Sequence, residues 1–337
     1  MCYRYNTNLD GHIADELYDR VKMALFPLAA RVVFSCRAGE PTLYPKWNRV
    51  VQDVADYGIQ GGLVTNATVL NSERIRQLVD GNFVVRFSVD GAASRTYQYV
   101  RGFPLSTVAR NIQEFISYRS SKKRSDAEAT TQPAWPPMTG VNFTPMMLNV
   151  RETPDMVDLI ADWGVEALFV QKFSSNNAYT SQSWSPETDP EAMKQIYDEA
   201  ARRAERRGVT LVIADTVRYQ PPDKRRGDPI PEMPHLGCAR PFSDAVVNQD
   251  GGVLPCCFGA PPMGYLQYQT FDEIWNGEAW RELRRGLVEG DPPAYCRKCH
   301  LLKSTGNGHK TSPFISIQAA VSRLRDFSHR VERQIGL

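Results

Sequence analysis

Cysteine spacing is the feature that most constrains how this chain can fold. Five of its seven cysteines lie between residues 238 and 299: Cys238, the adjacent pair Cys256 and Cys257, and then Cys296 and Cys299 as a C-x-x-C pair. The tight turn of a C-x-x-C pair directs two thiolates at one ion or cluster, and two cysteines distant in sequence complete a four-thiolate set. Such a set suits structural zinc or an iron–sulfur cluster, so the C-terminal part is expected to fold around one of them.

Other interpretations of these cysteines remain open at this point. Zinc is the main competitor, because four thiolates alone do not distinguish it from a cluster. Unrelated buried thiols would leave the C-x-x-C spacing to coincidence. Disulfides are not expected, because the number of cysteines is odd and no signal peptide is recognised in the printed sequence. Cys257 is interpreted as a spare thiol, although it could replace Cys256 as a ligand if the turn shifted by one residue.

Bulk properties set the broad class. A chain of 337 residues is long enough for about two domains, and its 42% apolar residues can form a buried core. The net charge of +2 gives no electrostatic argument for a nucleic-acid partner or for a membrane surface. No apolar run approaches the roughly 20 residues that span a bilayer. A reducing, cytoplasmic location is therefore expected.

Short β-branched runs alternate with segments of helical periodicity, the pattern of parallel βα units. A proline-rich stretch without periodicity, residues 220–236, marks the expected domain boundary, and residues 119–137 are expected to form a charged, solvated loop. The expected strands are 31–35, 62–65, 83–89, 141–144, 167–170 and 209–213, and the expected helices are 12–28, 46–57, 71–79, 105–118, 153–163, 189–207 and 314–335.

The sequence around the cysteines resembles a known family. Cys238-Ala-Arg-Pro-Phe is followed by Asn248-Gln-Asp-Gly-Gly-Val-Leu-Pro-Cys and by Thr270-Phe-Asp-Glu-Ile-Trp. These segments resemble the SPASM domain of radical S-adenosylmethionine (SAM) enzymes, in the shortened "twitch" form with one auxiliary 4Fe–4S cluster. The resemblance implies that Cys238, Cys256, Cys296 and Cys299 bind that cluster.

Four motifs earlier in the chain are similar to those of the same family, and they lie at the ends of expected strands or in the segments that follow them. They are Gly39-Glu-Pro (with Ala38 in place of a first glycine), Thr65-Asn-Ala-Thr, Ser88-Val-Asp-Gly and Tyr97-Gln-Tyr-Val-Arg-Gly. A guanidinium such as that of Arg101 can hold a carboxylate bidentately. The resemblance implies that SAM is bound by Gly39, Glu40, Pro41, Asn66, Ser88 and Arg101.

The start of the sequence departs from the family. A radical SAM enzyme holds its SAM-binding 4Fe–4S cluster with three cysteines in a C-x3-C-x2-C motif, and here only Cys2 stands where the third would be. The site is therefore expected to be incomplete in the printed chain. Two explanations stay open: a fragment that lacks the first barrel strand and two cysteines, which is preferred because a lost strand leaves an unpaired edge, or a protein that has lost the site.

The resulting expectation is a partial (β/α)6 radical SAM barrel lacking its first strand over residues 1–219, a SPASM/twitch domain over 220–310 and an amphipathic helix over 311–337. The implied activity is reductive cleavage of SAM to a 5′-deoxyadenosyl radical, which abstracts hydrogen from a substrate, by preference a peptide or protein. The implied electron donor is a flavodoxin or ferredoxin. The alternatives are a dehydrogenase acting on a small alcohol or sugar-like substrate, a non-catalytic cluster-binding barrel, and an unrelated zinc-stabilised barrel enzyme.

Overall fold

The computed structural model describes residues 11–35, 39–125, 139–171, 190–213, 238, 240–257, 260–297 and 299. These residues form two compact units, which divide between residues 219 and 220. The first contains the described residues from 31 to 213, and the second contains residues 11–30 together with those from 238 onward. The sequence analysis placed residues 11–30 in the first unit, so the structure differs from the expectation at this segment. The expected helix over 314–335 lies outside the described residues.

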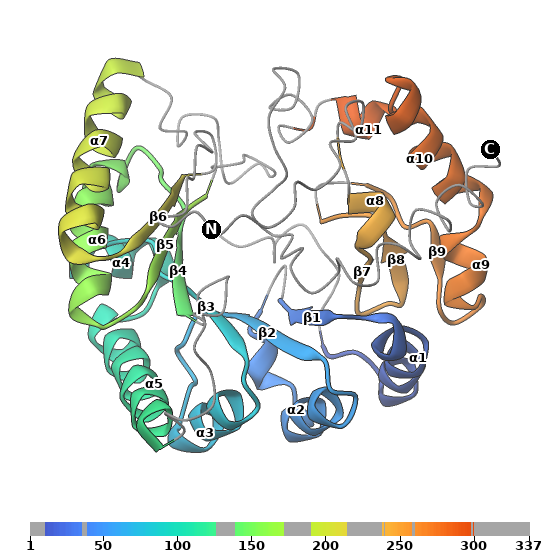
Figure 1. Cartoon of the computed structure of the whole chain (residues 1–337), viewed down its shortest axis with the longest axis horizontal. Helices are drawn as coiled ribbons and strands as arrows, with labels where there is room; N and C mark the ends of the chain where they lie inside the picture. The colour runs from blue at the N-terminus through green and yellow to red at the C-terminus, as the bar shows by residue number, and fades with distance from the viewer. Residues whose placement is uncertain are drawn as a thin grey trace. The chain divides into compact units, whose positions relative to one another are not determined.

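The first unit is built on a parallel six-stranded sheet (Figure 1). The strands follow one another in space in chain order, and the described part of the sheet is open, with β1 and β6 at its edges. Each strand is paired in parallel with the next, so all six carboxyl ends meet at one edge. The predicted fold class, a partial radical SAM barrel, is confirmed. The strands are β1 (Arg31–Phe34), β2 (Gln60–Thr65), β3 (Val84–Ser88), β4 (Thr139–Phe143), β5 (Ala167–Val170) and β6 (Thr210–Ile213).

Helices cover the outer face of this sheet (Figure 1). The ring of Phe34 lies 5.5 Å from that of Trp47 on α2, and the ring of Phe87 lies 5.5 Å from that of Phe115 on α5. Because side chains alternate between the faces of a strand, Arg86 and Ser88 face the inner side. The helices are α2 (Trp47–Asp56), α3 (Ser72–Asp80), α4 (Ser94–Arg101), α5 (Leu105–Ser125), α6 (Thr153–Asp162) and α7 (Pro190–Arg207), with short 3-10 turns η3 (Pro41–Leu43) and η4 (Val150–Glu152).

Helix α5 is longer than the sequence indicated. Residues 119–125 were expected to begin a solvated loop, but the helix continues to Ser125. Arg119 donates to the Glu166 carboxylate at 2.8 Å, and Lys122 lies 3.1 Å from Asp80. The charge run therefore extends the helix because its cations have carboxylate partners on other elements. The rest of the expected loop, residues 126–137, lies outside the described residues.

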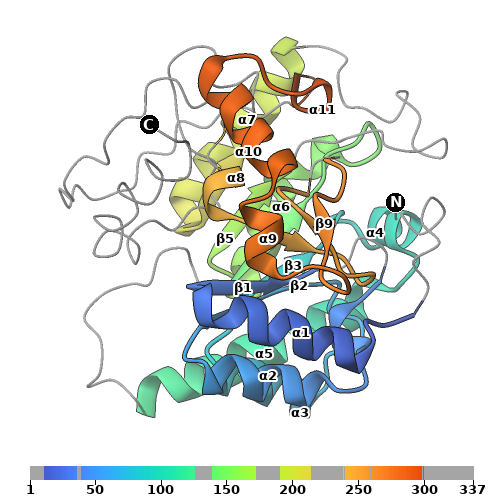
Figure 2. The same cartoon turned by 90° about the vertical axis from the view of Figure 1, so that its right-hand side faces the viewer.

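The second unit combines α1 (Asp15–Leu25), which ends in the 3-10 turn η2 (Phe26–Leu28), with a small antiparallel sheet and short helices (Figure 2). Leu17 of α1 packs in one apolar cluster with Val253, Leu266, Ile274 and Trp280. This contact explains why the N-terminal helix belongs to the C-terminal unit. The other elements are α8 (Arg240–Ser243), β7 (Val246–Val247), β8 (Gly252–Leu254), β9 (Gly264–Tyr265), α9 (Phe271–Trp275), α10 (Glu278–Glu289) and α11 (Ala294–Arg297). None of the described helices has the length and apolar character that a bilayer crossing needs.

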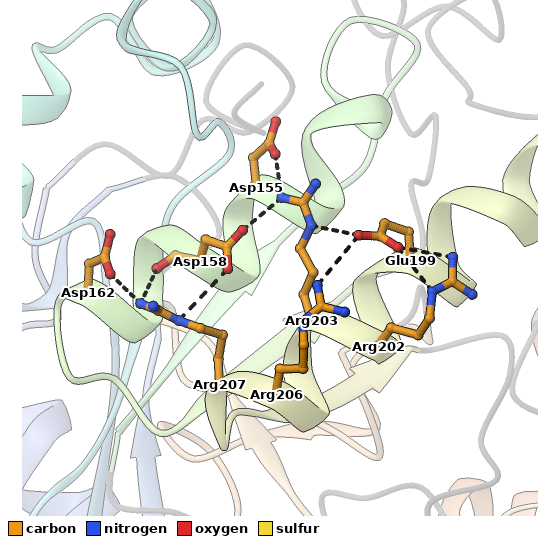
Figure 3. A network of polar contacts seen from close by, with 8 residues as sticks. All are labelled: Asp155, Asp158, Asp162, Glu199, Arg202, Arg203, Arg206 and Arg207. Carbon is orange, nitrogen blue, oxygen red and sulfur yellow. Dashed lines mark hydrogen bonds and ion pairs between the residues drawn. The ribbon is translucent and has the colours of Figure 1, made fainter.

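Ion pairs join α6 to α7 along the outer surface of the first unit (Figure 3). Arg203 is the centre of this ladder: its Nη1 donates to Asp155 at 2.8 Å and to Asp158 at 2.7 Å, and its Nε donates to Glu199 at 2.9 Å. One turn further, Arg207 contacts Asp158 and Asp162. A network of this kind contributes more than isolated surface pairs do.

Replacing Arg203 with Met is expected to lower the free energy of unfolding by about 1 kcal/mol, because three carboxylates lose one shared cation. The loss should shrink in 1 M salt, where charges are screened beyond about 3 Å. Urea denaturation at low and high salt measures both effects. The matched control is Arg206→Met on the same helix, since the nearest carboxylate oxygen to Arg206 is 3.8 Å away. An equal loss in both variants would show that the ladder is not the cause.

Candidate functional site

Glu40 fastens the loop after β1 to the turn after β2. Its carboxylate is buried and accepts four hydrogen bonds. Oε1 accepts from Thr42 Oγ1 at 2.8 Å, from Thr42 N at 3.3 Å and from Thr65 Oγ1 at 2.8 Å, and Oε2 accepts from Asn66 N at 2.8 Å. Three of these donors meet at Oε1 and one at Oε2, and together they fix the loop that presents the exposed Gly39. A direct contact between Glu40 and an ammonium group stays a prediction.

The turn after β2 contains an alanine in a conformation that favours glycine. Ala67 has φ +60° and is fully buried, and the left-handed region costs a non-glycine residue roughly 1–2 kcal/mol. Its amide donates to Thr65 Oγ1 at 3.0 Å, and its carbonyl accepts from Asn111 at 2.8 Å. Asn66 accepts from the Thr68 amide at 2.9 Å. Asn111, which the sequence analysis did not select, thus holds the turn in place.

Asp90 is the buried acid at the end of β3. It is 0% exposed, its Oδ1 accepts from Thr144 N at 2.7 Å, and its Oδ2 lies 2.5 Å from Arg101 Nη2. A Cβ at Gly91 would lie 2.8 Å from Tyr97 N, so only glycine lets α4 fold back and bring Arg101 to Asp90. The ion pair has poor hydrogen-bond geometry, since Asp90 Oδ2 and the buried Arg101 Nε both lack a hydrogen-bond partner.

Two residues that the sequence analysis missed hold α4 over the strand ends. Glu152 accepts from Ala92 N at 2.7 Å and from Thr96 Oγ1 at 2.5 Å, which caps the start of the helix. Asn149 Nδ2 donates to Asp90 O at 3.0 Å. Glu152 lies 60 residues after Ala92, so no local sequence signal could have indicated this cap.

Buried polar atoms without partners gather near the carboxyl ends of β3 and β4. Besides Arg101 Nε, they are the Tyr97 hydroxyl and Asn142 Oδ1. Burial, opposed by the charge of Arg101 and aided by that of Asp90, raises the pKa of Tyr97 to about 12. Asn142 lies opposite Ser88 in the sheet register. Buried polar groups are normally hydrogen-bonded, so these orphan atoms fit a polar ligand such as SAM at this edge.

Four cysteines of the second unit line one cavity, and they are the four that the sequence analysis selected: Cys238, Cys256, Cys296 and Cys299. Cys257 is exposed and does not line it, which favours Cys256 over Cys257 as the ligand. The five described cysteines are all thiols. Among the described residues, the rest of the lining contains one charged side chain, that of Arg240, and also includes Pro241, Pro255, Ala260, Leu283, Leu287 and Tyr295.

The thiols influence one another's ionisation. Burial raises the pKa of Cys238, and burial together with the charges of the other three thiols raises the pKa of Cys296 to about 11. Four thiolates therefore cannot form together unless a bound cation or cluster supplies positive charge. No three His, Cys, Asp or Glu side chains of the described residues are grouped closely enough to hold one metal ion, although all four thiols face the same cavity. The donor set fits an iron–sulfur cluster, and Cys2 and Cys36 lie outside the described residues.

Helix α10 positions the segment that carries the first of these cysteines. Trp280 Nε1 and Arg284 Nε both donate to the carbonyl of Pro241, at 2.8 Å and 2.9 Å. Arg284 also donates from Nη1 to Trp275 O at 2.9 Å and is only 1% exposed. The chain three residues after Cys238 is therefore fixed by two buried donors of one helix.

Comparisons with known proteins agree with both units. Residues 238–300 match the SPASM family, an iron–sulfur cluster-binding domain. A tungsten-containing aldehyde ferredoxin oxidoreductase cofactor-modifying protein from Pyrococcus furiosus is 27% identical over 142 residues, which are 42% of this chain and 37% of that protein. The PqqA peptide cyclase of Bradyrhizobium diazoefficiens is 24% identical over 294 residues, which are 82% of this chain and 70% of the cyclase.

Solved structures show the same fold. The Streptococcus suis protein SuiB bound to SAM superposes with a TM-score of 0.57 at 14% identity, over 88% of this chain and 68% of SuiB. SuiB bound to its precursor peptide SuiA gives a TM-score of 0.54 at 13% identity, over 84% of this chain and 62% of SuiB.

The barrel fold, the cysteine cavity and the relatives agree with the predicted class, a radical SAM enzyme with SAM and 4Fe–4S clusters as cofactors. More narrowly, residues 238–300 match the SPASM domain, and the six-stranded sheet has the fold of the SAM-bound SuiB structure, in agreement with the resemblance found in the sequence. Its match to the first of the two relatives spans only 37% of that protein. The roles of the individual site residues remain predictions.

Replacing Glu40 with Gln is expected to lower the free energy of unfolding by about 1–3 kcal/mol. The glutamine amide has an NH2 group in place of one carboxylate oxygen, so at least one buried donor that now binds the carboxylate would face another donor and lose its acceptor. Chemical denaturation measures the loss. Glu73→Gln is the matched control, since among the described residues that exposed carboxylate accepts from Asn48 and Gln77 alone. A loss no larger than that of the control would contradict the bracing role of Glu40.

Proposed function

We propose that this chain cleaves SAM reductively and abstracts hydrogen from a peptide or protein substrate. The observation that carries the proposal is the convergence of four thiols on one cavity in a domain that matches a cluster-binding family. The peptide substrate is supported by the PqqA peptide cyclase and by the SuiB complex with its precursor peptide. A reduced 4Fe–4S cluster, when bound, supplies the electron that cleaves SAM to the 5′-deoxyadenosyl radical.

The strand-end residues of the barrel hold SAM in this proposal. Gly39 and Pro41 present main-chain groups in a loop that Glu40 keeps rigid. Asn66 shapes the turn after β2, and Ser88 faces the inner side at the end of β3. Arg101, which Asp90 anchors through one nitrogen, offers its unpartnered Nε to the SAM carboxylate.

The cysteines divide into two groups. Cys238, Cys256, Cys296 and Cys299 bind the auxiliary 4Fe–4S cluster in the cavity of the second unit. Cys2 contributes to the SAM-binding cluster, for which the printed sequence supplies one cysteine at the expected place. We further propose that the electron comes from a flavodoxin or ferredoxin and that the protein works in the cytoplasm.

After anaerobic reconstitution, the auxiliary site is expected to hold about four irons and as many sulfides per chain. Cys256→Ser should lose this cluster because one of the four thiolate ligands is removed. Cys257→Ser is the matched control and should keep it, since the neighbouring thiol lies outside the cavity. Iron, zinc and acid-labile sulfide analysis tests the assignment. Zinc without sulfide would refute the cluster, and cluster loss in Cys257→Ser alone would reassign the ligand.

With a low-potential reductant, the reconstituted protein is expected to convert SAM to 5′-deoxyadenosine and methionine, measured by chromatography under anaerobic conditions. Arg101→Met should lower the rate at subsaturating SAM by at least about tenfold, the effect of roughly 1.4 kcal/mol of lost binding. Arg95→Met, on the same helix, is the control. Where the reading frame continues upstream of Met1, the longer chain is assayed beside the printed one. Intact clusters with no SAM cleavage by either chain would favour a non-catalytic, cluster-binding protein.

A further inference from the structure

Arg86 places a buried cation on the inner face of the barrel sheet. It lies on β3, is only 8% exposed, and its guanidinium carbon lies 3.3 Å from the ring centroid of Phe169 on β5. No described residue accepts a hydrogen bond from this side chain, and its buried Nη1 has no partner. The contact with Phe169 holds the guanidinium flat but satisfies none of its donors.

A second cation adds to this charge. Arg31 on β1 donates to the neutral Gln60 side chain from Nε at 3.2 Å and from Nη2 at 2.7 Å, and neither arginine forms an ion pair with a described residue. Burial, followed by the charge of Arg31, lowers the pKa of Arg86 to about 9, which leaves it protonated at neutral pH. The six strands themselves carry no aspartate or glutamate. Two positive charges thus lie on the inner face without a described counter-ion.

The neighbouring strand leaves room for this arrangement. A Cβ at Gly140 of β4 would lie 2.7 Å from the Phe169 ring and 3.2 Å from Arg86 Nη1. Glycine at this position therefore allows the guanidinium to cross β4 and stack on β5. A planar guanidinium fixed in this way presents paired donors that match a carboxylate.

Keeping a charge buried without a partner is costly, and native proteins normally pair it. The geometry points to a ligand as that partner: Arg86, with Arg31 beside it, binds a carboxylate of the substrate, the side chain of an aspartate or glutamate in a peptide. This inference rests on the proposed peptide substrate and makes it more specific. Arg86 lies two residues before Ser88, so an acidic side chain held there would orient the peptide below the strand ends where SAM is proposed to bind.

The test measures the binding of N-acetyl-glutamate N-methylamide to the reconstituted full chain by ligand-observed NMR. The glutamine analogue has the same shape but no charge and serves as the control ligand. We expect the glutamate derivative to bind at least about tenfold more tightly than its neutral analogue. Equal binding of the two compounds would overturn the inference.

Three variants connect that binding to Arg86. Arg86→Met should abolish the tenfold preference, and Arg86→Lys should retain part of it, because the charge remains while the planar pair of donors is lost. Gly140→Ala keeps the arginine but displaces its stack on Phe169, so it should also weaken the preference. An undiminished preference in Arg86→Met would overturn the inference.

Thermal unfolding of the ligand-free protein separates binding from a purely architectural role. If Arg86 serves to bind a ligand, Arg86→Met should be at least as stable as the wild-type protein, because the substitution removes an unpaired buried charge. A markedly lower melting temperature for Arg86→Met, in the absence of any carboxylate preference in the wild-type protein, would assign Arg86 to the architecture. Neither measurement requires SAM cleavage, so failure of the proposed radical chemistry would be seen separately.

Discussion

A carboxylate buried away from water must be neutralised or fully hydrogen-bonded, and this constraint organises the carboxyl edge of the barrel sheet. Glu40 accepts from the amide of Asn66, which ties the loop after β1 to the turn after β2. Asp90 accepts from the amide of Thr144, which ties the ends of β3 and β4. Glu152 caps α4 from the start of α6. Because each acid reaches a main-chain amide of another element, the candidate SAM-binding edge is fixed by backbone contacts rather than by loop sequence alone.

The second unit, which carries the four cysteines, also contains a buried charge, and there it is a cation. Arg284 is buried, and its burial lowers the pKa to about 10, yet it has main-chain carbonyls as acceptors and lies 4.3 Å from the ring centroid of Trp275. Together with Trp280 it fixes the carbonyl of Pro241, so the position of Cys238 depends on the packing of α10. The remaining thiols come from the segment after β8 and from α11 and its end. Four thiols from separate segments thus meet at one cavity in the structure that this helix and the small sheet hold together.

Sequence patterns predicted the six strands and the grouping of the four cysteines because both signals are local: β-branched runs, and a C-x-x-C turn with a family motif around it. The errors and omissions come from long-range partners. Helix α5 extends past its expected end because Arg119 donates a hydrogen bond to Glu166, 47 residues away in the sequence. Helix α4 was missed because it is short and is capped by Glu152. Helical periodicity predicted a helix at α1, but only the structure shows that Leu17 packs with Val253 of the C-terminal unit.

The polar groups of the barrel therefore fall into two kinds with different consequences for ligands. Groups with several hydrogen bonds to other elements, such as the Glu40 carboxylate, fix the backbone whether or not a ligand is bound. Groups that are buried but incomplete, such as Arg101 Nε, the Tyr97 hydroxyl and the Arg86 guanidinium, gain an interaction only when a ligand arrives. Because an unmade buried hydrogen bond costs about 1–3 kcal/mol, each of them favours the bound state over the free one. A residue that a ligand would pair can therefore lie outside the recognised motifs, as Arg86 does.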